Sequence, residues 1–278
     1  MTEPQAPGPP ARPTLNSILE ATRTRVSRLR AQRADLERAA ARAGPVPPWR
    51  AALAGGDLAV IAEVKRRSPS AGAIAPGLDP AVHARGYAAG GARALSVLTD
   101  EPHFGGSLDD LRAVRRAVDL PVLRKDFIID PLQLFESRAA GASAVLLIVR
   151  AVPPETLCQL SELAADLGLA RLVEVHGAAE LERAVALGPE CIGVNARDLD
   201  TFHVDLDAAR AVLRRVPAAV IAVAESGIVT RDDAERVATD GADAILVGTA
   251  LAGAPDPAAA VRRLVGVPRA RDARRESR

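Results

Sequence analysis

The chain has 278 residues, of which 48% are hydrophobic and 26% are charged. This is enough apolar sequence for one large domain with a substantial core, and α/β barrels commonly reach this length undivided. The formal net charge is +1, from 36 Lys and Arg against 35 Asp and Glu, so electrostatics exclude nucleic acid or a membrane surface as the expected main partner. Any anion must be held by a local site.

The first residues predict a tail, and the segments after it predict no membrane anchor. Residues 1–13 are crowded with Pro, Gly and Ala and are expected to be a disordered tail. No apolar run is long enough to cross a bilayer, and the N-terminus lacks the apolar core of a secretory signal. The acidic residues Glu20, Asp35 and Glu37 weaken a transit-peptide interpretation. We therefore expect a cytoplasmic protein.

The two cysteines, Cys158 and Cys191, lie within apolar patterns and have no metal-ligand or CxxC spacing. We expect both to be buried free thiols in a reducing compartment. The sequence contains no metal-binding cluster and no cofactor motif, so no metal and no cofactor is expected.

An amphipathic helix is predicted next, because Leu15, Ile18, Leu19, Thr22, Val26 and Leu29 recur at helical spacing with arginines over the other faces. We favour a helix that packs its apolar stripe on the domain and leaves its basic face in solvent. The alternative is a helix whose basic face contacts a membrane or nucleic acid. The Pro-rich residues 44–48 end the helix. Residues 14–48 are thus expected to form a helical extension packed on a barrel of residues 49–267, with a charged tail at residues 268–278.

From Leu58 onward, apolar β-type runs alternate with helical patterns. The expected strands are Leu58–Lys65, Arg93–Asp100, Leu120–Asp126, Ser143–Arg150, Leu169–His176, Cys191–Asn195, Ala219–Glu225 and Asp243–Gly248. The intervening helices include Pro80–Ala89, Ser107–Val118, Pro131–Ala140, Pro153–Leu167, Ala178–Leu187 and Arg231–Thr239. Gly-Ala pairs at Gly91, Gly141 and Gly241 are typical of helix C-caps. Eight near-continuous apolar strands joined by helices predict a closed (β/α)₈ TIM barrel, and no GxGxxG follows the first strand to favour an open dinucleotide-binding sheet.

Polar residues fall at the C-terminal strand ends, where barrels of this kind carry their active sites. The period of two along a strand places Lys125, Glu174 and Glu225 on the face of the apolar residues two positions earlier, which is the barrel interior. Glu63, Lys65 and Asn195 complete a ring of two lysines, three glutamates and an amide. A set of salt bridges closing the barrel would explain one such residue. A whole ring is better explained by a ligand or a reaction, because several desolvated charges cost several kcal/mol each.

A second signal follows the last two strands. Ser226-Gly227 and Gly248-Thr249 place small residues where backbone amides can approach a ligand, and each pair could lead into a helix N-terminus. Either pair alone is common turn chemistry. Their joint position predicts a phosphate site.

The segment Arg66–Asp79, rich in Ser, Pro, Ala and Gly, follows the first strand. Such a loop beside catalytic groups is expected to be a lid that orders over substrate.

These stretches resemble the indole-3-glycerol-phosphate synthase family of the tryptophan pathway. The resemblance lies in IAEVKRRSPSAG (Ile61–Gly72), LTDEPHFGGS (Leu98–Ser107), LRKDFIIDP (Leu123–Pro131), LVEVH (Leu172–His176), IGVNARDLDTFHVD (Ile192–Asp205), AESGI (Ala224–Ile228) and LVGTAL (Leu246–Leu251). It spans the whole barrel. The helix from Leu15 is similar to the family's N-terminal extension.

The resemblance implies an enzyme that closes, decarboxylates and dehydrates 1-(2-carboxyphenylamino)-1-deoxy-D-ribulose 5-phosphate. It implies that Lys125 is the general acid at the substrate carbonyl, that Glu174 is the acid/base carboxylate, and that Glu63 is its partner. By the same resemblance, Lys65 holds an anionic substrate group and serves a later proton transfer.

The remaining implied roles concern binding. Asn195 and Arg197 would position the substrate, with Ser68, Glu225 and Ser226 as further binding residues. Phe104 and Phe127 would form aromatic walls. The phosphate would be held by Gly227, Gly248 and Thr249. His103, Ala196 and Thr249 depart from the residues usual in the family, which affects binding detail and none of the proton carriers.

The residue chemistry agrees with this reaction, which needs an acid at the carbonyl oxygen and a carboxylate that moves protons. A lysine near a second cation in a partly dry cavity is expected to have a lowered pKa and to be a usable acid at neutral pH. Two alternatives remain: another phosphate-binding barrel, such as a sugar-phosphate isomerase, and a non-catalytic barrel that docks a partner through Leu15–Arg42. The expected partner is a small phosphorylated substrate, and the expected state is a monomer or a weak homo-oligomer.

Overall fold

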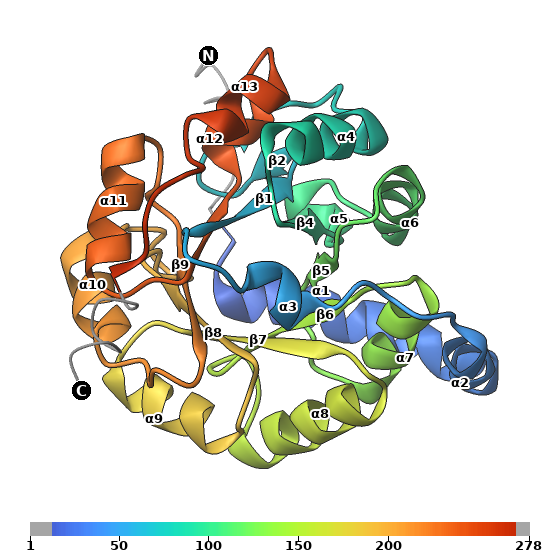
Figure 1. Ribbon diagram of the computed structural model, residues 1–278. Helices are drawn as coiled ribbons and strands as arrows, with labels where there is room; N and C mark the ends of the chain where they lie inside the picture. The colour runs from blue at the N-terminus through green and yellow to red at the C-terminus, as the bar shows by residue number, and fades with distance from the viewer. Residues whose placement is uncertain (1–12, 271–278) are drawn as a thin grey trace, which may run out of the picture.

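A computed structural model describes residues 13–270. The expected N-terminal tail, except for its last residue, and most of the expected C-terminal tail therefore lie outside the described residues. Within the described range, the chain forms a closed barrel of eight parallel strands (Figure 1). The strands are β1 (Ala59–Val64), β4 (Ala94–Leu98), β5 (Val122–Lys125), β6 (Ala144–Ile148), β7 (Ala170–Val175), β8 (Cys191–Asn195), β9 (Ile221–Glu225) and β10 (Ala244–Val247). The first strand pairs with the last, so the predicted (β/α)₈ barrel is confirmed.

Helices follow the strands and cover the outside of the barrel. They are α4 (Pro80–Gly90), α5 (Glu101–Phe104), α6 (Leu108–Ala117), α7 (Pro131–Ala139), α8 (Pro154–Asp166), α9 (Ala178–Ala186), α10 (Leu206–Leu213), α11 (Arg231–Thr239), α12 (Thr249–Ala252) and α13 (Pro257–Arg262). Capping boxes at Ser107, Asp130 and Thr230 begin α6, α7 and α11 by satisfying amides that have no helical partner. The glycines of the three Gly-Ala pairs have positive φ, as the C-cap prediction requires.

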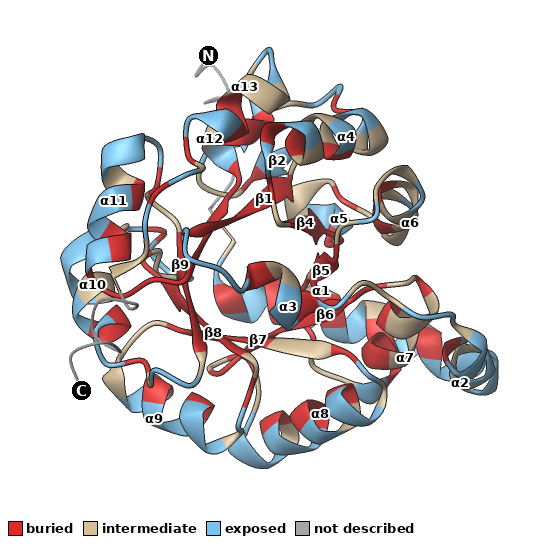
Figure 2. Ribbon diagram, viewed as in Figure 1, coloured by how far each residue is buried: buried red, intermediate tan, exposed pale blue. Residues whose placement is uncertain are grey.

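The apolar residues divide into two layers. One layer lies between the strands and the outer helices, while the second fills the barrel interior with alternate strand residues such as Ile61, Leu123, Leu172 and Val223. Figure 2 shows the barrel strands mostly buried, with part of β7 of intermediate burial, and the helices exposed along their outer faces. Lys125, Glu174 and Glu225 continue the interior rows, so the predicted parity is confirmed.

The two ends of the barrel are covered by different helices, which lie in front of and behind the strands in Figure 1. At the end where the strands begin, α3 (Trp49–Leu53) packs Trp49 and Leu53 into the interior. At the end where the strands finish, α1 (Leu15–Leu29) packs Leu15, Ile18 and Leu19 against the same interior cluster. The helix is therefore one wall of the mouth of the barrel.

The N-terminal extension differs from the single helix that the spacing predicts. A short 3₁₀ segment, η1 (Arg30–Gln32), separates α1 from α2 (Arg33–Arg42). The two helices pack on different partners, because α1 covers the barrel mouth while α2 lies against α7. A continuous helix could not serve both surfaces, and the 3₁₀ segment provides the change in direction.

The prediction of two buried thiols is wrong for one of them. Cys191 on β8 is fully buried, but Cys158 is exposed on the outer face of α8, whose buried positions are Leu157, Leu160, Ser161 and Ala164. The apolar pattern around Cys158 belongs to those neighbours. Across residues 13–270, no helix combines the length and apolar character that crossing a membrane requires.

Candidate active site

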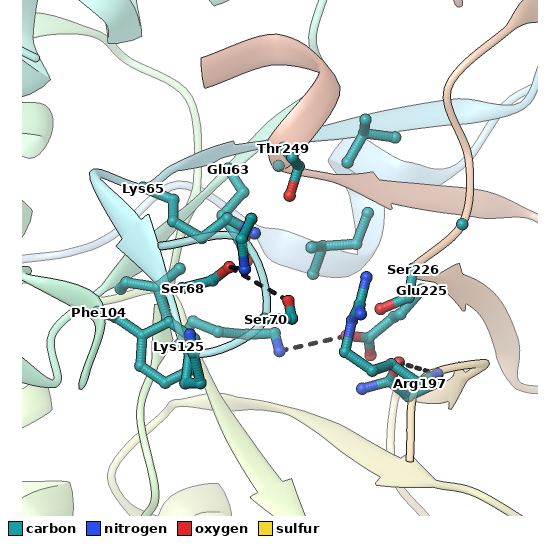
Figure 3. Close-up of a pocket in the computed structure, with 18 of the residues that line it drawn as sticks. Glu63, Lys65, Ser68, Ser70, Phe104, Lys125, Arg197, Glu225, Ser226 and Thr249 are labelled. Atoms are coloured by element: carbon teal, nitrogen blue, oxygen red, sulfur yellow. Dashed lines mark hydrogen bonds and ion pairs between the residues drawn. The ribbon is translucent and has the colours of Figure 1, made fainter. Parts of the chain in front are cut away.

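Every site residue predicted from the sequence lines one cavity of about 370 Å³ at the C-terminal ends of the strands. Figure 3 shows the labelled side chains converging on this space from β1, β5 and β9 and from the loops that follow the strands. The cavity also reaches Ser70, Leu199 and Phe202, to which the sequence assigned no role.

Lys125, at the end of β5, extends between two carboxylates from other strands of the barrel. Its Nζ lies 3.3 Å from Glu174 Oε2 and 3.4 Å from Glu225 Oε2. The three side chains come from β5, β7 and β9, and alternate strands of a barrel contribute to the same interior layer. Closure of the sheet is what brings these distant residues together.

The expectation of a lowered lysine pKa is wrong for Lys125. Burial alone would lower the pKa of Lys125, but Glu174, Glu225 and Glu63 together raise it above its usual value. The second cation, Lys65, is itself paired with Glu63, so its charge is largely compensated. Lys125 is consequently protonated at neutral pH and is in the form that an acid requires.

Glu174 and Glu225 differ in ionisation although both are buried. Burial acts to raise the pKa of Glu174, but Lys125, His176 and a hydrogen bond from Asn195 outweigh it and lower the pKa. Asn195 Nδ2 donates to Glu174 Oε1 at 3.1 Å. Burial, with the charges of Glu174 and Glu63, raises the pKa of Glu225 to about 8 despite the attraction of Lys125. At neutral pH the cavity therefore holds one ionised carboxylate and one carboxylic acid beside the same lysine.

Two glycines leave room for the carboxylates. A Cβ at Gly193 on β8 would collide with Glu225 Oε1, and a Cβ at Gly248 would collide with Glu63 Oε1. The same Cβ at Gly248 would lie only 2.8 Å from Lys65 Nζ. Gly248, which the sequence assigned to the phosphate, thus also makes space for the Glu63–Lys65 pair, whose Nζ and Oε1 are 2.8 Å apart.

An aromatic and aliphatic wall faces the charged groups. The rings of Phe104 and Phe127 lie with centroids 6.3 Å apart at an interplanar angle of 37°. Phe202 completes this wall from the loop after β8, with Leu199. Phe202 has a φ of 58°, an unusual conformation for a bulky residue, and its carbonyl accepts a hydrogen bond from Arg197 Nη1 at 3.1 Å. Burial lowers the pKa of Arg197, whose guanidinium lines the cavity.

The rim after β9 and β10 contains the small residues of the predicted phosphate site. Ser226 and Gly227 have φ of 67° and 76°, a left-handed turn that sets successive backbone amides around a concavity. Thr249 begins α12 directly after β10, but α11 begins only at Arg231 with Thr230 as its N-cap. Only the second pair therefore leads directly into a helix.

Sequence reasoning missed several residues of the site. Gly193 and Phe202 lie within the motif IGVNARDLDTFHVD and received no role, because neither a glycine in a strand nor a loop aromatic signals a site by itself. Ser96, whose Oγ donates to Glu63 Oε2 at 3.4 Å, lies inside an apolar strand. His176 follows Glu174 at the same parity, and that spacing could have identified it.

Fold and site together define a barrel enzyme with an acid–base cluster at the strand ends, placed between an apolar wall and a rim of small residues. Among residues 13–270, no group of three or more His, Cys, Asp and Glu side chains is placed to hold a metal ion. The particular family follows from comparison with known proteins.

A family model described as indole-3-glycerol phosphate synthase matches residues 15–264. An indole-3-glycerol phosphate synthase of Nocardioides sp. is 55% identical over 80% of this chain and 84% of the relative. A Mycobacterium ulcerans protein with the same name is 49% identical over 90% of this chain and 93% of the relative. The chain belongs to the indole-3-glycerol phosphate synthase family, a family of decarboxylating carbon–carbon lyases of tryptophan biosynthesis.

Solved structures of lower identity share the fold alone. A thiamine phosphate pyrophosphorylase from Pyrococcus furiosus matches with a TM-score of 0.56 at 21% identity, over 74% of this chain and 93% of that chain. A 3-hexulose-6-phosphate synthase from Salmonella typhimurium matches with a TM-score of 0.56 at 15% identity, over 74% of this chain and 96% of that chain.

Proposed function

We propose that the protein converts 1-(2-carboxyphenylamino)-1-deoxy-D-ribulose 5-phosphate to indole-3-glycerol phosphate, with Lys125 as the general acid and Glu174 as the acid/base carboxylate. The observation that carries this assignment is the position of Lys125 Nζ, 3.3 Å from an ionised carboxylate and 3.4 Å from a largely protonated one in a single cavity. A protonated lysine and an ionised carboxylate in contact can donate one proton and accept another without long-range movement.

The cavity offers complementary surfaces for the parts of this substrate. The arylamine ring fits the wall of Phe104 and Phe127, and the phosphate fits the rim of Gly227, Gly248 and Thr249. Ser68, Glu225 and Ser226 lie on the walls between them. Lys65 and Arg197 are cations in reach of the anionic groups, and Asn195 holds both Glu174 and the backbone N–H of Arg197. Binding of both ends would place the substrate carbonyl at Lys125.

The reaction divides among these groups as follows. As the ring carbon that bears the carboxylate attacks the carbonyl carbon, Lys125 gives a proton to the carbonyl oxygen, and carbon dioxide then leaves to restore the aromatic ring. The hydroxyl departs as water after it is protonated, and a proton leaves the adjacent carbon to complete the indole. Glu174 accepts that proton, while Lys65, whose Nζ lies 2.8 Å from Glu63, donates the proton with which the hydroxyl leaves as water.

Activity assays of single variants test this assignment. Purified protein mixed with the substrate should develop indole absorbance, and Lys125→Ala should lower kcat by roughly 10²-fold or more with a smaller change in KM. Glu174→Gln keeps the shape of the side chain and removes the proton acceptor, so it should also be slow. The two losses should not add, because Lys125 and Glu174 are in direct contact at 3.3 Å and each variant disturbs the other group.

Fluorescence or calorimetric melting of the same variants supplies the control. Lys125→Ala that melts several degrees lower and turns over at nearly the wild-type rate would identify the cluster as a structural cap of the barrel. Wild-type protein with no turnover of this substrate would leave a different phosphate-binding enzyme as the better description.

The partner and location follow from this proposal. The small phosphorylated substrate is consumed in the cytoplasm, where we place the protein on the ground that its relatives are bacterial biosynthetic enzymes. The expectation of a monomer or a weak homo-oligomer stays a prediction from the sequence.

A further inference from the structure

His176 lies directly after β7 and two residues beyond Glu174, so strand periodicity turns both side chains toward the same face. Its side chain is only 5% exposed. Nε2 is 3.5 Å from Glu174 Oε1, and Nδ1 is 3.4 Å from Glu180 Oε2. The imidazole therefore lies between two carboxylates, one of which belongs to the cavity.

The carboxylate of Glu180, on the side of the His176 ring away from the cavity, is held by several contacts. Glu180, in the first turn of α9, accepts the backbone N–H of His176 at Oε2 with a distance of 2.9 Å. Arg150, in the turn after β6, contacts the other oxygen of Glu180 at 2.8 Å and reaches Asp198 in the loop after β8 at 3.3 Å. These contacts fix the plane of the His176 ring from behind.

The inner nitrogen is aimed at Glu174. His176 Nε2 is buried and has no hydrogen-bond partner among the described residues, and buried polar atoms of this kind call for an explanation. The nearest acceptor is Glu174 Oε1, which also receives the amide of Asn195, while Oε2 faces Lys125. A small tightening of the 3.5 Å separation would complete a hydrogen bond on the side of Glu174 away from the lysine.

We propose that His176 is a positioning residue for Glu174, holding the carboxylate at the angle from which it exchanges protons with substrate, with Glu180 as the fixed support behind the ring. The proposal rests on the acid/base role proposed for Glu174. The charged groups that face this pair are Lys125 on β5, Arg150 after β6, Glu180 on α9 and Glu225 on β9. Of the two ring nitrogens, Nε2 contacts Glu174 and Nδ1 contacts Glu180.

Two amide variants separate these nitrogens. The amide nitrogen of Gln reaches the position of Nε2, whereas that of Asn reaches the position of Nδ1. His176→Asn should lower kcat by roughly tenfold to hundredfold with KM within about twofold, because Glu174 is misplaced while the binding surfaces are intact. His176→Gln should keep most of the wild-type kcat.

The pH profile supplies a readout that a structural role would not move. The contact with His176 favours the ionised form of Glu174 and lowers its pKa. Loss of that contact raises the pKa of Glu174, so the acidic limb of kcat against pH should move to higher pH in His176→Asn. His83→Gln, a histidine on the outer helix α4, is the matched control and should leave both kcat and the profile unchanged.

A double variant decides whether His176 acts through Glu174. Added to Glu174→Gln, His176→Asn should cause no further loss of kcat. The proposal is wrong if His176→Asn turns over and titrates like wild type, if the Asn and Gln variants are equally slow and melt equally early, or if the double variant is much slower than Glu174→Gln. A normal rate for Glu174→Gln would overturn both this proposal and the role of Glu174, whereas an inactive wild type would overturn the proposed function itself.

Discussion

Glu225 is a carboxyl group without a hydrogen-bond partner among the described residues, although it lies in the middle of the charged cluster. Its contact with Lys125 at 3.4 Å is weaker than a well-formed ion pair, and Glu174 and Glu63 repel its negative form. Burying the neutral carboxylic acid costs less free energy than burying the ionised carboxylate. Glu225 therefore limits the negative charge around Lys125 while keeping an acid beside it.

This protonation predicts a pH-dependent stability. The folded protein holds the Glu225 proton up to about pH 8, while an unfolded glutamate releases it near its ordinary pKa of 4.5. Between these values the folded state binds more protons, so this group contributes stability at low pH that is lost as the pH rises through the folded pKa. Glu225→Gln stays neutral, and its melting temperature relative to wild type should increase from pH 5 to pH 8.5.

Melting curves at several pH values test this prediction, with Glu155→Gln on the exposed side of α8 as the control. The control should show no comparable trend. A melting difference for Glu225→Gln that is constant with pH would mean that Glu225 is ionised throughout.

At the scale of elements, strand β8 shapes the site both through the side chain of Asn195 and through the lack of a side chain at Gly193. Its Asn195 contacts Glu174, and its Gly193 leaves the space that Glu225 occupies from the neighbouring strand β9. Asn195 was predicted to belong to the site because it ends its strand, but the need for a glycine depends on which strands are adjacent and on their stagger. Gly193 pairs with Val223, two residues before Glu225. This pairing cannot be predicted from the sequence of β8 alone.

Gly193→Ala should therefore displace Glu225. The added methyl group would overlap Oε1, so we expect kcat/KM to fall by roughly tenfold or more because a displaced carboxyl group disturbs Lys125. Steady-state kinetics measure the change. Gly177→Ala is the matched control, since a Cβ there meets no atom within 4 Å and its φ is −164°. Equal activity of the two variants would show that Glu225 has room to move.

The segment after β1 is a second element whose behaviour is testable. Arg67–Ser68 and Gly72–Ala73 form the short hairpin β2–β3, Arg66 is paired with Asp110, and Ser68 and Ser70 line the cavity. A hairpin held at its base with an exposed tip fits the predicted lid.

Trypsin should cut free protein after the exposed Arg67, and a saturating substrate analogue should slow that cut by roughly tenfold as the segment orders. Gel analysis of timed digests follows the fragments. Cutting at the same rate with and without analogue would indicate a rigid hairpin.

The sequence was informative where one strand or helix carried the pattern and failed where several elements meet. Alternation along single strands predicted the interior positions of Lys125, Glu174 and Glu225. The direction of the Lys125 pKa was predicted wrongly because the neighbouring lysine was counted without its partner Glu63. The break at η1 was missed because both halves of the extension keep helical spacing while packing on different surfaces.

For the whole molecule, the N-terminal extension is joined to the catalytic strand by a buried ion network. Arg25 on α1 contacts both oxygens of Asp126 at 2.8 and 2.9 Å, and Arg124 contacts Asp126 and Glu136 at 2.8 Å. Burial would raise the pKa of Asp126, but the two arginines hold it at about 2. Arg124 and Asp126 flank Lys125 in sequence, so the network fixes the end of β5 from outside while the lysine points inward.

Arg25→Ala should lower the free energy of unfolding by about 2 kcal/mol, because it removes charge-assisted hydrogen bonds from a buried carboxylate. It should also raise KM, since α1 packs its apolar side chains against the wall that contains Phe127. Denaturant titration and steady-state kinetics measure the two effects. Arg23→Ala, exposed on the same helix, should change neither, and equal effects of the two variants would show that α1 is not anchored through Asp126.

The end of the barrel where the strands begin, here called the floor, contains an intrinsic fluorescent probe, Trp49. The protein's single tryptophan, Trp49, is 2% exposed and donates from Nε1 to Cys191 Sγ at 3.2 Å, at the end of the barrel opposite the cavity. A thiol in contact with an indole ring quenches its emission, so native fluorescence should be dim and should brighten and shift to the red when the floor opens. Ligands at the mouth should leave this signal unchanged, which makes emission from Trp49 a measure of barrel integrity that is independent of occupancy.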